Sequence, residues 1–265
     1  MQQRHTNRCT YFKELANTSR EFYIPYLLRF TPPPINSSLN ILEVGCGEGG
    51  NLVPFAQLGC KVTGVDISEC RIVEAKEYFS KFSKDAIFVC QDFAKFPIPS
   101  KEEDKFDVIL LHDVIEHVPT KEQFLAHIKK FLKSTGALFV GFPAWQMPFG
   151  GHQQICKSKF CSHMPFLHLL PNALYRLTLK MCKETPGIIN ELMSIKECRT
   201  SIELFEKLIC KCGYSVVDRT FWFINPHYKQ KFHLTPRLLP HWMGKIKYVR
   251  NFFTTSCWYV LESEN

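Results

Sequence analysis

The stretch Ile41-Leu42-Glu43-Val44-Gly45-Cys46-Gly47-Glu48-Gly49-Gly50 decides the fold of this 265-residue chain. The apolar run 40–44 ends in a cluster of glycines, which predicts a buried strand followed by a tight turn. Glycine permits positive φ angles and lets a ligand approach the backbone closely. The stretch therefore predicts a candidate binding turn at the carboxyl end of a strand.

Strand and helix patterns alternate along the chain after this turn. Further strands are predicted over 61–65, 86–90, 106–111, 137–142, 214–223 and 256–261. The pattern predicts an α/β fold with a doubly wound, seven-stranded, mostly parallel sheet of the Rossmann-like kind, covered by helices on both faces.

Helix boundaries follow from capping patterns in the sequence. Ser68 is the expected N-cap of a helix whose inner face carries Ile72, Val73, Ala75 and Phe79. Capping boxes are predicted for two later helices, at Thr120 with Gln123 and at Thr200 with Glu203, and Gly136 is the expected end of the first of these.

Residues 144–200 interrupt the alternation with Pro148, Pro165, Pro171 and Pro186. A connection of this length predicts a helical insertion over one end of the sheet, where it would cover an acceptor. Its apolar residues predict either a partly apolar cavity or, as we favour, the insertion's own core; they include Phe166, Leu167, Leu169, Leu170 and Leu174.

Four predicted strands end in residues suited to one nucleoside-bearing ligand, and ligands of open α/β sheets bind at these ends. After the Gly-rich turn, the second strand ends in Asp66, whose carboxylate suits ribose hydroxyls. The third ends in Gln91-Asp92-Phe93, a polar pair for the adenine amino group beside an aromatic ring for its face. The fourth ends in His112-Asp113.

Two kinds of ligand fit these residues. Gly45, Gly47 and Gly50 also match the G-x-G-x-x-G pattern of dinucleotide binding, with Asp66 at the distance expected for NAD. A dinucleotide presents its pyrophosphate to the first helix, and Glu43 and Glu48 would repel it. The positively charged sulfonium and ammonium groups of S-adenosylmethionine suit these carboxylates better than a pyrophosphate does. We therefore favour S-adenosylmethionine and keep an NAD-dependent oxidoreductase as the alternative.

At this point the sequence resembles a known family. The segment 41–49 is similar to the first motif of the class I S-adenosylmethionine-dependent methyltransferases, and Val65-Asp66-Ile67-Ser68 to their acidic second motif. The segments 106–109 and 114–118 resemble the fourth-strand region of the branch that includes ubiquinone-biosynthesis and small-molecule methyltransferases. The resemblance implies a seven-stranded sheet with an antiparallel last strand.

The resemblance also implies a role for each position. Glu43 would serve the methionine ammonium, the backbone of Gly45 and Gly47 the aminocarboxypropyl chain, and Asp66 the ribose, with His112 nearest the sulfonium. The expected cofactor-binding residues are Glu43, Gly45, Cys46, Gly47, Asn51, Asp66, Ile67, Gln91, Asp92, Phe93 and His112. We expect one methyltransferase domain over 1–265, comprising an N-terminal helical segment 1–35, a cofactor-binding half 36–143, the insertion 144–200 and a last part 201–265.

The expected reaction is methyl transfer to a small-molecule or glycan-type acceptor at oxygen. A hydroxyl must lose a proton, and histidine titrates near neutral pH. His152, which follows two glycines beyond the fifth strand, is the candidate base, and His112, Glu116 and His117 compete for the role. Tyr11, Arg20 and Tyr23 are expected on a helix that closes over the cofactor. The Asn/Asp-Pro-Pro-aromatic turn of enzymes that methylate nucleic-acid bases does not follow the fourth strand.

Composition bounds the remaining possibilities. With 45% hydrophobic and 22% charged residues, no apolar N-terminal stretch and no long apolar run, the chain is expected to be cytoplasmic, without a membrane span. Its 12 cysteines are scattered. Cys156, Cys161 and His163 lack a second ligand pair at the usual spacing, so we expect no metal site.

The net charge of +8 is concentrated late in the chain. Residues 229–250 carry Lys229, Lys231, Arg237, Lys245, Lys247 and Arg250 among aromatic residues. A nucleic-acid-binding protein built on this fold is a third hypothesis. We favour the simpler interpretation, a solvated connection that packs its aromatic residues inward.

Overall fold

A computed structural model describes residues 8–30, 35, 38–82 and 86–264. Its strands are β1 (Asn40–Val44), β2 (Lys61–Asp66), β3 (Ile87–Cys90), β4 (Phe106–His112), β5 (Leu132–Phe142), β6 (Tyr214–Ile224), β7 (Arg237–Leu238) and β8 (Ser256–Ser263). They form one sheet in the order β3-β2-β1-β4-β5-β8-β6-β7. The seven predicted strands are confirmed, and the two-residue β7 is an eighth that is too short to leave a periodic signal.

Strand directions also agree with the prediction. The pairs β3-β2, β2-β1, β1-β4 and β4-β5 are parallel, and β8 lies antiparallel between β5 and β6. The β4–β5 register is Val108↔Ala137 to His112↔Gly141, so the ends of these two strands lie side by side. This register brings the segments after β4 and β5 to the same edge of the sheet.

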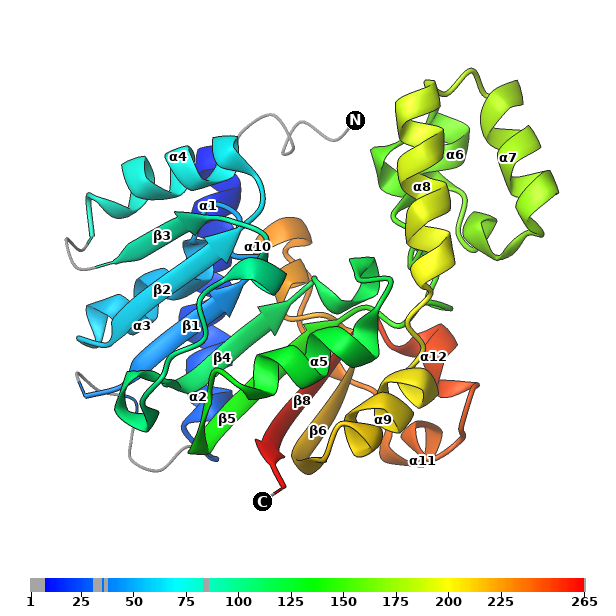
Figure 1. The fold of residues 1–265 in the computed structure, drawn as a ribbon. Coiled ribbons are helices and arrows are strands. Elements are labelled where there is room, and N and C mark those ends of the chain that lie inside the picture. The colour runs from blue at the N-terminus through cyan, green and yellow to red at the C-terminus, as the bar shows by residue number, and fades with distance from the viewer. Residues whose placement is uncertain (1–7, 31–34, 36–37, 83–85, 265) are drawn as a thin grey trace.

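Helices cover both faces of the sheet (Figure 1). Alternate strand residues point to opposite faces, so Ile41 packs in one hydrophobic cluster and Leu42 in another. The first cluster lies under α1 (Arg8–Thr18), a π-helical turn η2 (Ser19–Tyr23), α2 (Ile24–Leu27), α3 (Val53–Gln57) and α4 (Glu69–Phe79). The second lies under α5 (Lys121–Lys129) and α9 (Ile202–Lys211).

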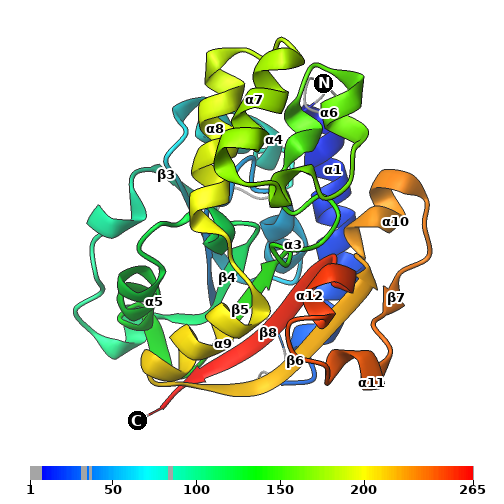
Figure 2. The same ribbon diagram turned by 90° about the vertical axis from the view of Figure 1, so that its right-hand side faces the viewer.

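The insertion forms α6 (Lys159–His163), α7 (Asn172–Met181) and α8 (Pro186–Cys198), with a small hydrophobic core of its own. In Figures 1 and 2 these helices lie beyond the carboxyl ends of the parallel strands. Leu167 joins the insertion's core, whereas Phe166 and Leu174 are exposed. The late connection contains α10 (His227–Phe232), α11 (His241–Gly244) and α12 (Arg250–Phe253).

Several local predictions were wrong in detail. Gly136 lies inside β5 rather than at a helix end. A glycine is required at this position because a Cβ would lie 2.9 Å from the Phe106 carbonyl oxygen on the neighbouring strand. Val73 is 60% exposed instead of facing inward. Ser201 caps α9 through its hydroxyl, since the neighbouring Thr200 is buried and bonds the Ile115 carbonyl. Thr120 precedes α5 without a side-chain cap.

The basic connection 229–250 also differs from the prediction. Trp242 is 64% and Tyr248 67% exposed, so these aromatic side chains do not pack inward. Arg250 is instead buried, and it pairs with Glu203 and Glu206. Among the described residues, no helix has the length and apolar character needed to cross a membrane.

Candidate active site

The Gly-rich turn after β1 adopts the conformation that only glycine accepts easily. Gly45, Gly47 and Gly49 have φ angles of 72°, 53° and 79°. A Cβ on Gly45 would lie 2.4 Å from the Val114 side chain, so the turn also needs the missing volume. Cys46 is buried, and its sulfur lies against the position of Gly64 on β2. The turn thus packs tightly against its neighbours in the sheet.

Asp66 at the end of β2 fixes this turn. One carboxylate oxygen accepts from the Gly47 backbone N–H and the other from the Ser68 N–H, both at 2.8 Å. The next residue, Ile67, is 76% exposed, although Val65, two positions earlier, is buried. The structure therefore places an oriented carboxylate and an uncovered apolar side chain beside the Gly-rich turn.

Glu43 and Asn51 form a buried polar pair beneath the turn. Asn51 donates from Nδ2 to Oε1 of Glu43 at 2.7 Å. Glu43 Oε2 and Asn51 Oδ1 are buried acceptors without a hydrogen-bond partner among the described residues. Burial raises the pKa of Glu43 to about 8. Two unsatisfied acceptors fit a cationic group such as the ammonium of S-adenosylmethionine, because such a group would restore the ionised carboxylate.

Glu48 has a partner that the sequence did not reveal. Arg8 on α1 donates to its carboxylate, and Glu48 is 2% exposed. This hydrogen bond raises the pKa of Arg8 further. Because Arg8 compensates the charge of Glu48 and burial favours the protonated form of Glu43, charge repulsion is a weaker argument against a pyrophosphate than the sequence suggested.

One predicted cofactor residue in the segment after β3, Phe93, does not lie as expected. Asp92 is exposed and caps a short 3₁₀ turn by accepting from the Ala94 N–H at 3.0 Å, while Gln91 donates to the Lys95 carbonyl. Phe93 is 5% exposed, and its ring lies 4.8 Å from that of Phe131. The expected packing of the Phe93 ring on an adenine is therefore wrong, because this ring belongs to the hydrophobic core.

His112 at the end of β4 is held from three directions. Its Nε2 lies 2.7 Å from the hydroxyl of Tyr23, and its Nδ1 lies 3.4 Å from the Asp113 carboxylate. Its ring also sits where a side chain on Gly141 would be. Tyr23 from the N-terminal segment thus contacts a predicted cofactor residue, whereas Arg20 is exposed and bonds Asn17 and Gln57.

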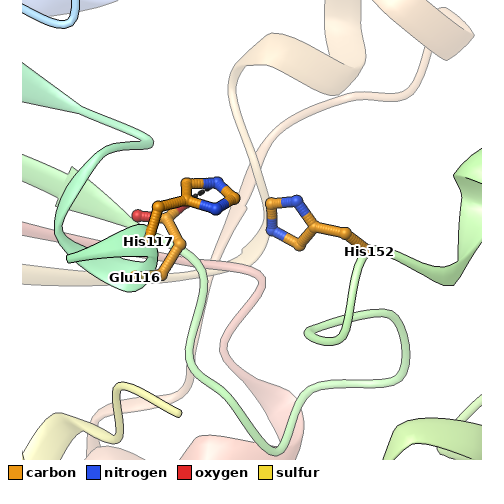
Figure 3. A group of neighbouring side chains, drawn as sticks. All are labelled: Glu116, His117 and His152. Carbon is orange, nitrogen blue, oxygen red and sulfur yellow. Dashed lines mark ion pairs between the residues drawn. The ribbon is translucent and has the colours of Figure 1, made fainter. Parts of the chain in front are cut away.

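A cluster of three titratable side chains lies where the segments after β4 and β5 meet. The rings of His117 and His152 approach edge to face with centroids 4.9 Å apart, and Glu116 lies beside them (Figure 3). One ligand atom of each residue lies within 4.8 Å of the others. Burial raises the pKa of Glu116 well above its usual value. Its oxygens have no hydrogen-bond partner among the described residues, and Oε1 lies 4.0 Å from Nε2 of His117.

His152 is neutral at physiological pH in this setting. Burial and the neighbouring His117 lower its pKa to about 4. Its backbone is left-handed, with φ of 56°, in the loop that two glycines introduce. Burial also lowers the pKa of His117. Both imidazoles therefore have a nitrogen lone pair available at neutral pH.

A cavity of about 350 Å³ opens beside this cluster and the Gly-rich turn. The sequence pointed to Tyr11, Glu48, Asp113 and His152 among its lining residues, but most of the lining comes from segments without a recognisable motif. Its apolar side chains come from the start of the insertion, not from the residues near 170. The lining is Arg8, Tyr11, Glu14, Glu48, Arg71, Asp113, Pro143, Met147, Phe149, His152, Gln154, Ile155, Asn225, His227, Tyr228, Lys231 and Thr255.

A family model described as a methyltransferase domain matches residues 35–218. The chain belongs to the class I S-adenosylmethionine-dependent methyltransferases. The matched range includes the Gly-rich turn, Asp66, the His117–His152 contact and the whole insertion. The cofactor of this methyltransferase is S-adenosylmethionine, and the oriented Asp66 and the unsatisfied acceptors of Glu43 and Asn51 fit it.

Curated relatives of this methyltransferase include two ubiquinone biosynthesis O-methyltransferases. The protein from Bartonella quintana is 33% identical over 152 residues, which cover 53% of this chain and 60% of that protein. The protein from Pelagibacter ubique is 32% identical over 134 residues, covering 50% of this chain and 51% of that protein. The chain spans about half the length of the curated relatives it matches.

Solved structures share the fold of the methyltransferase. The plantazolicin methyltransferase BpumL, in complex with a triazolic desmethylPZN analog and S-adenosylhomocysteine, is 16% identical with a TM-score of 0.54, over 98% of this chain and 88% of that one. The magnesium protoporphyrin IX methyltransferase ChlM from Synechocystis has a TM-score of 0.52 at 16% identity, over 97% and 84% of the two chains.

Proposed function

We propose that this methyltransferase methylates a hydroxyl oxygen of a small-molecule or glycan-type acceptor, with His152 as the general base. The observation that carries the proposal is the neutral His152 imidazole at the wall of a 350 Å³ cavity that also reaches Glu48 beside the Gly-rich turn. The curated relatives are O-methyltransferases of ubiquinone biosynthesis, which supports an oxygen acceptor.

We assign the cofactor to the turn and the adjoining strand ends. Glu43 and Asn51 would meet the ammonium, the backbone of Gly45, Cys46 and Gly47 the aminocarboxypropyl chain, and Asp66 the ribose. When bound, S-adenosylmethionine supplies an electrophilic methyl group on a sulfonium. The adenine end would meet Ile67, Gln91 and Asp92 together with the backbone of Phe93, and His112 would lie towards the sulfonium.

His152 has one chemical task in this scheme. His152 would take the proton of the acceptor hydroxyl as the oxygen bonds the methyl group, and the methyl–sulfur bond would break so that the donor leaves as neutral S-adenosylhomocysteine. Alignment within the cavity provides most of the remaining rate enhancement, because the methyl group is already activated. His117 acts as a positioning residue, since its ring contacts that of His152 edge to face.

The experiment pairs His152→Ala with His163→Ala, an exposed histidine of the insertion that bonds the Lys159 carbonyl. Both variants are incubated with isotope-labelled S-adenosylmethionine and panels of phenols, sugars, amines and RNA, and the methylated atom is located by mass spectrometry. We expect transfer to a hydroxyl that His152→Ala slows by roughly 10²- to 10⁴-fold while S-adenosylmethionine affinity is retained.

Two results would contradict the proposal. Transfer confined to amines or RNA would overturn the assigned acceptor. Equal turnover of His152→Ala and His163→Ala on the true acceptor would remove His152 as the base. The NAD-dependent and nucleic-acid-binding alternatives gain no support from the comparisons.

A further inference from the structure

The insertion contains a second buried cluster that the methyl-transfer site does not use. Cys156 and Cys161 are both 0% exposed and form part of the insertion's core. A carboxylate oxygen of Glu184 and the two sulfurs lie within 4.8 Å of one another. The insertion thus gathers two thiols and a carboxylate at one buried point.

Cys182 adds a third thiol to this cluster. Its side chain is in hydrogen-bonding contact with that of Cys161. The thiol of Cys156 is in turn in contact with Cys161 and with the Glu184 carboxyl group. The four side chains therefore form a connected set, in which Cys156 and Cys161 are five positions apart and Cys182 and Glu184 are two positions apart in the chain.

The fold brings the two halves of the set together through a strained turn. Lys183 follows α7 with a left-handed φ of 59°, and the Glu184 N–H bonds the Leu179 carbonyl at 3.1 Å. A residue other than glycine pays about 1 kcal/mol or more for this conformation. The turn directs Glu184 to the start of α6, where its carboxylate accepts from the backbone N–H groups of Lys157 and Ser158.

We propose that Cys156, Cys161, Cys182 and Glu184 form a structural zinc site with three sulfur ligands and one oxygen ligand. Thiolates and a carboxylate are ligands that Zn²⁺ takes in tetrahedral sites, and a site closed to solvent is structural rather than catalytic. As the ion binds, each thiol transfers its proton to solvent and its sulfur bonds the metal. His163 takes no part, because it is exposed and bonds the Lys159 carbonyl.

The carboxylate in the cluster and the small size of the insertion's hydrophobic core favour a zinc site over a purely hydrophobic cluster. A carboxylate oxygen of Glu184 lies within 4.8 Å of the two fully buried sulfurs of Cys156 and Cys161, an arrangement that a bound cation would stabilise. Four lysines lie within two positions of a ligand in the sequence: Lys157, Lys159, Lys180 and Lys183. The insertion's hydrophobic core is small, and small units are commonly stabilised by a metal.

The first test measures the metal content of the tag-free full chain, produced with zinc in the medium. We expect about one zinc ion per chain, retained on dialysis. Removing it with a chelator should lower the melting temperature, because the ion binds the folded chain alone, and adding zinc should restore it. Rebinding at neutral pH should release about three protons, and Co²⁺ in its place should show thiolate charge-transfer absorption.

Variants locate the ion. Cys156→Ser, Cys161→Ser and Cys182→Ser should each lose the zinc on dialysis, and Glu184→Gln should weaken retention at least about tenfold. Cys210→Ser, at an exposed cysteine on α9, and Cys60→Ser, at a buried cysteine outside the insertion, are the matched controls and should keep it.

Three results would overturn the proposal. The absence of zinc from the wild-type chain would rule the site out; a disulfide between any two of Cys156, Cys161 and Cys182 would exclude it; and zinc retained equally by the ligand and control variants would place the ion elsewhere. The metal content and cobalt spectrum of the wild-type chain decide the question even if a serine variant fails to fold.

Discussion

The Tyr23 hydroxyl lies 2.7 Å from Nε2 of His112, although 89 residues separate the two in sequence. Tyr23 is 1% exposed, and its ring packs on those of Phe139 and Trp258. The contact ties the N-terminal segment to the end of β4, where the sulfonium is expected. The N-terminal segment thus positions a predicted cofactor residue.

Tyr23→Phe should keep the ring packing and lose this hydrogen bond. Leaving a buried imidazole nitrogen unpaired should cost about 1–3 kcal/mol of unfolding free energy and weaken S-adenosylmethionine binding. Tyr26→Phe is the control, because the Tyr26 hydroxyl bonds Asp218. Urea unfolding and calorimetric titration check both variants; equal cofactor affinity in the two would contradict a positioning role for Tyr23.

Glu43 should make the stability of the cofactor-free chain depend on pH. Burial raises its pKa from 4.5 to about 8, so in this window the folded chain holds a proton that the unfolded chain has lost. Stability is therefore full below the lower value and falls as pH rises through the upper one. Glu43→Gln should remove a loss on the order of 2–4 kcal/mol between about pH 5 and pH 9.

Urea unfolding of both chains across this range measures the effect. The control is Glu191→Gln, an exposed carboxyl group on α8, which should follow the wild-type profile. Parallel profiles for Glu43→Gln and the wild type would show that Glu43 titrates normally.

Gly45→Ala should destabilise the fold more than an ordinary glycine substitution. The new Cβ would lie 2.4 Å from the Val114 side chain at a φ of 72°, so strain and overlap add to more than about 2 kcal/mol. Gly187→Ala on α8 meets nothing within 4 Å and should leave stability unchanged or raise it by up to about 1 kcal/mol. Denaturant midpoints compare the two, and similar values would refute the strained turn.

Arg250 should behave as a structural residue within the basic connection. It is 2% exposed and pairs with Glu203 and Glu206, so Arg250→Met would remove two ion pairs. Since Glu206 keeps Arg219 and Glu203 keeps Asn251, we expect a cost of about 1.5–3 kcal/mol. Lys247→Met, at an exposed position, should change stability by less than about 0.5 kcal/mol. Thermal unfolding compares the two variants. Equal changes in melting temperature would show that Arg250 contributes no more to stability than an exposed lysine does.

Short-range patterns predicted most of the fold correctly. Apolar runs such as 40–44 located the strands, because strands buried on both faces need continuous apolar sequence. Gly136 misled the prediction, since a glycine required by close strand packing has the same local signal as a glycine that ends a helix. The strand β7 left no signal because two residues carry no periodicity.

The same difference between local signals and tertiary contacts applies to the candidate site. Residues that end a strand, such as Asp66 and His112, could be proposed from the sequence because the carboxyl ends of parallel strands meet at one edge of a sheet. Phe93 was assigned to the ligand although its ring belongs to the core, because the sequence does not show which way a side chain turns. The partnership of Arg8 with Glu48 spans 40 residues and leaves no pattern.

The sequence by itself determined the alternating α/β fold, the Gly-rich turn and the kind of cofactor, because strand periodicity and positive-φ turns are local properties of the chain. Tertiary structure alone decided which side chains meet: His117 with His152, Tyr23 with His112, and the thiols of Cys156 and Cys161 with Cys182 and Glu184. Such contacts depend on the register of β4 against β5 and on the turn after α7, which bring together segments that no local pattern connects.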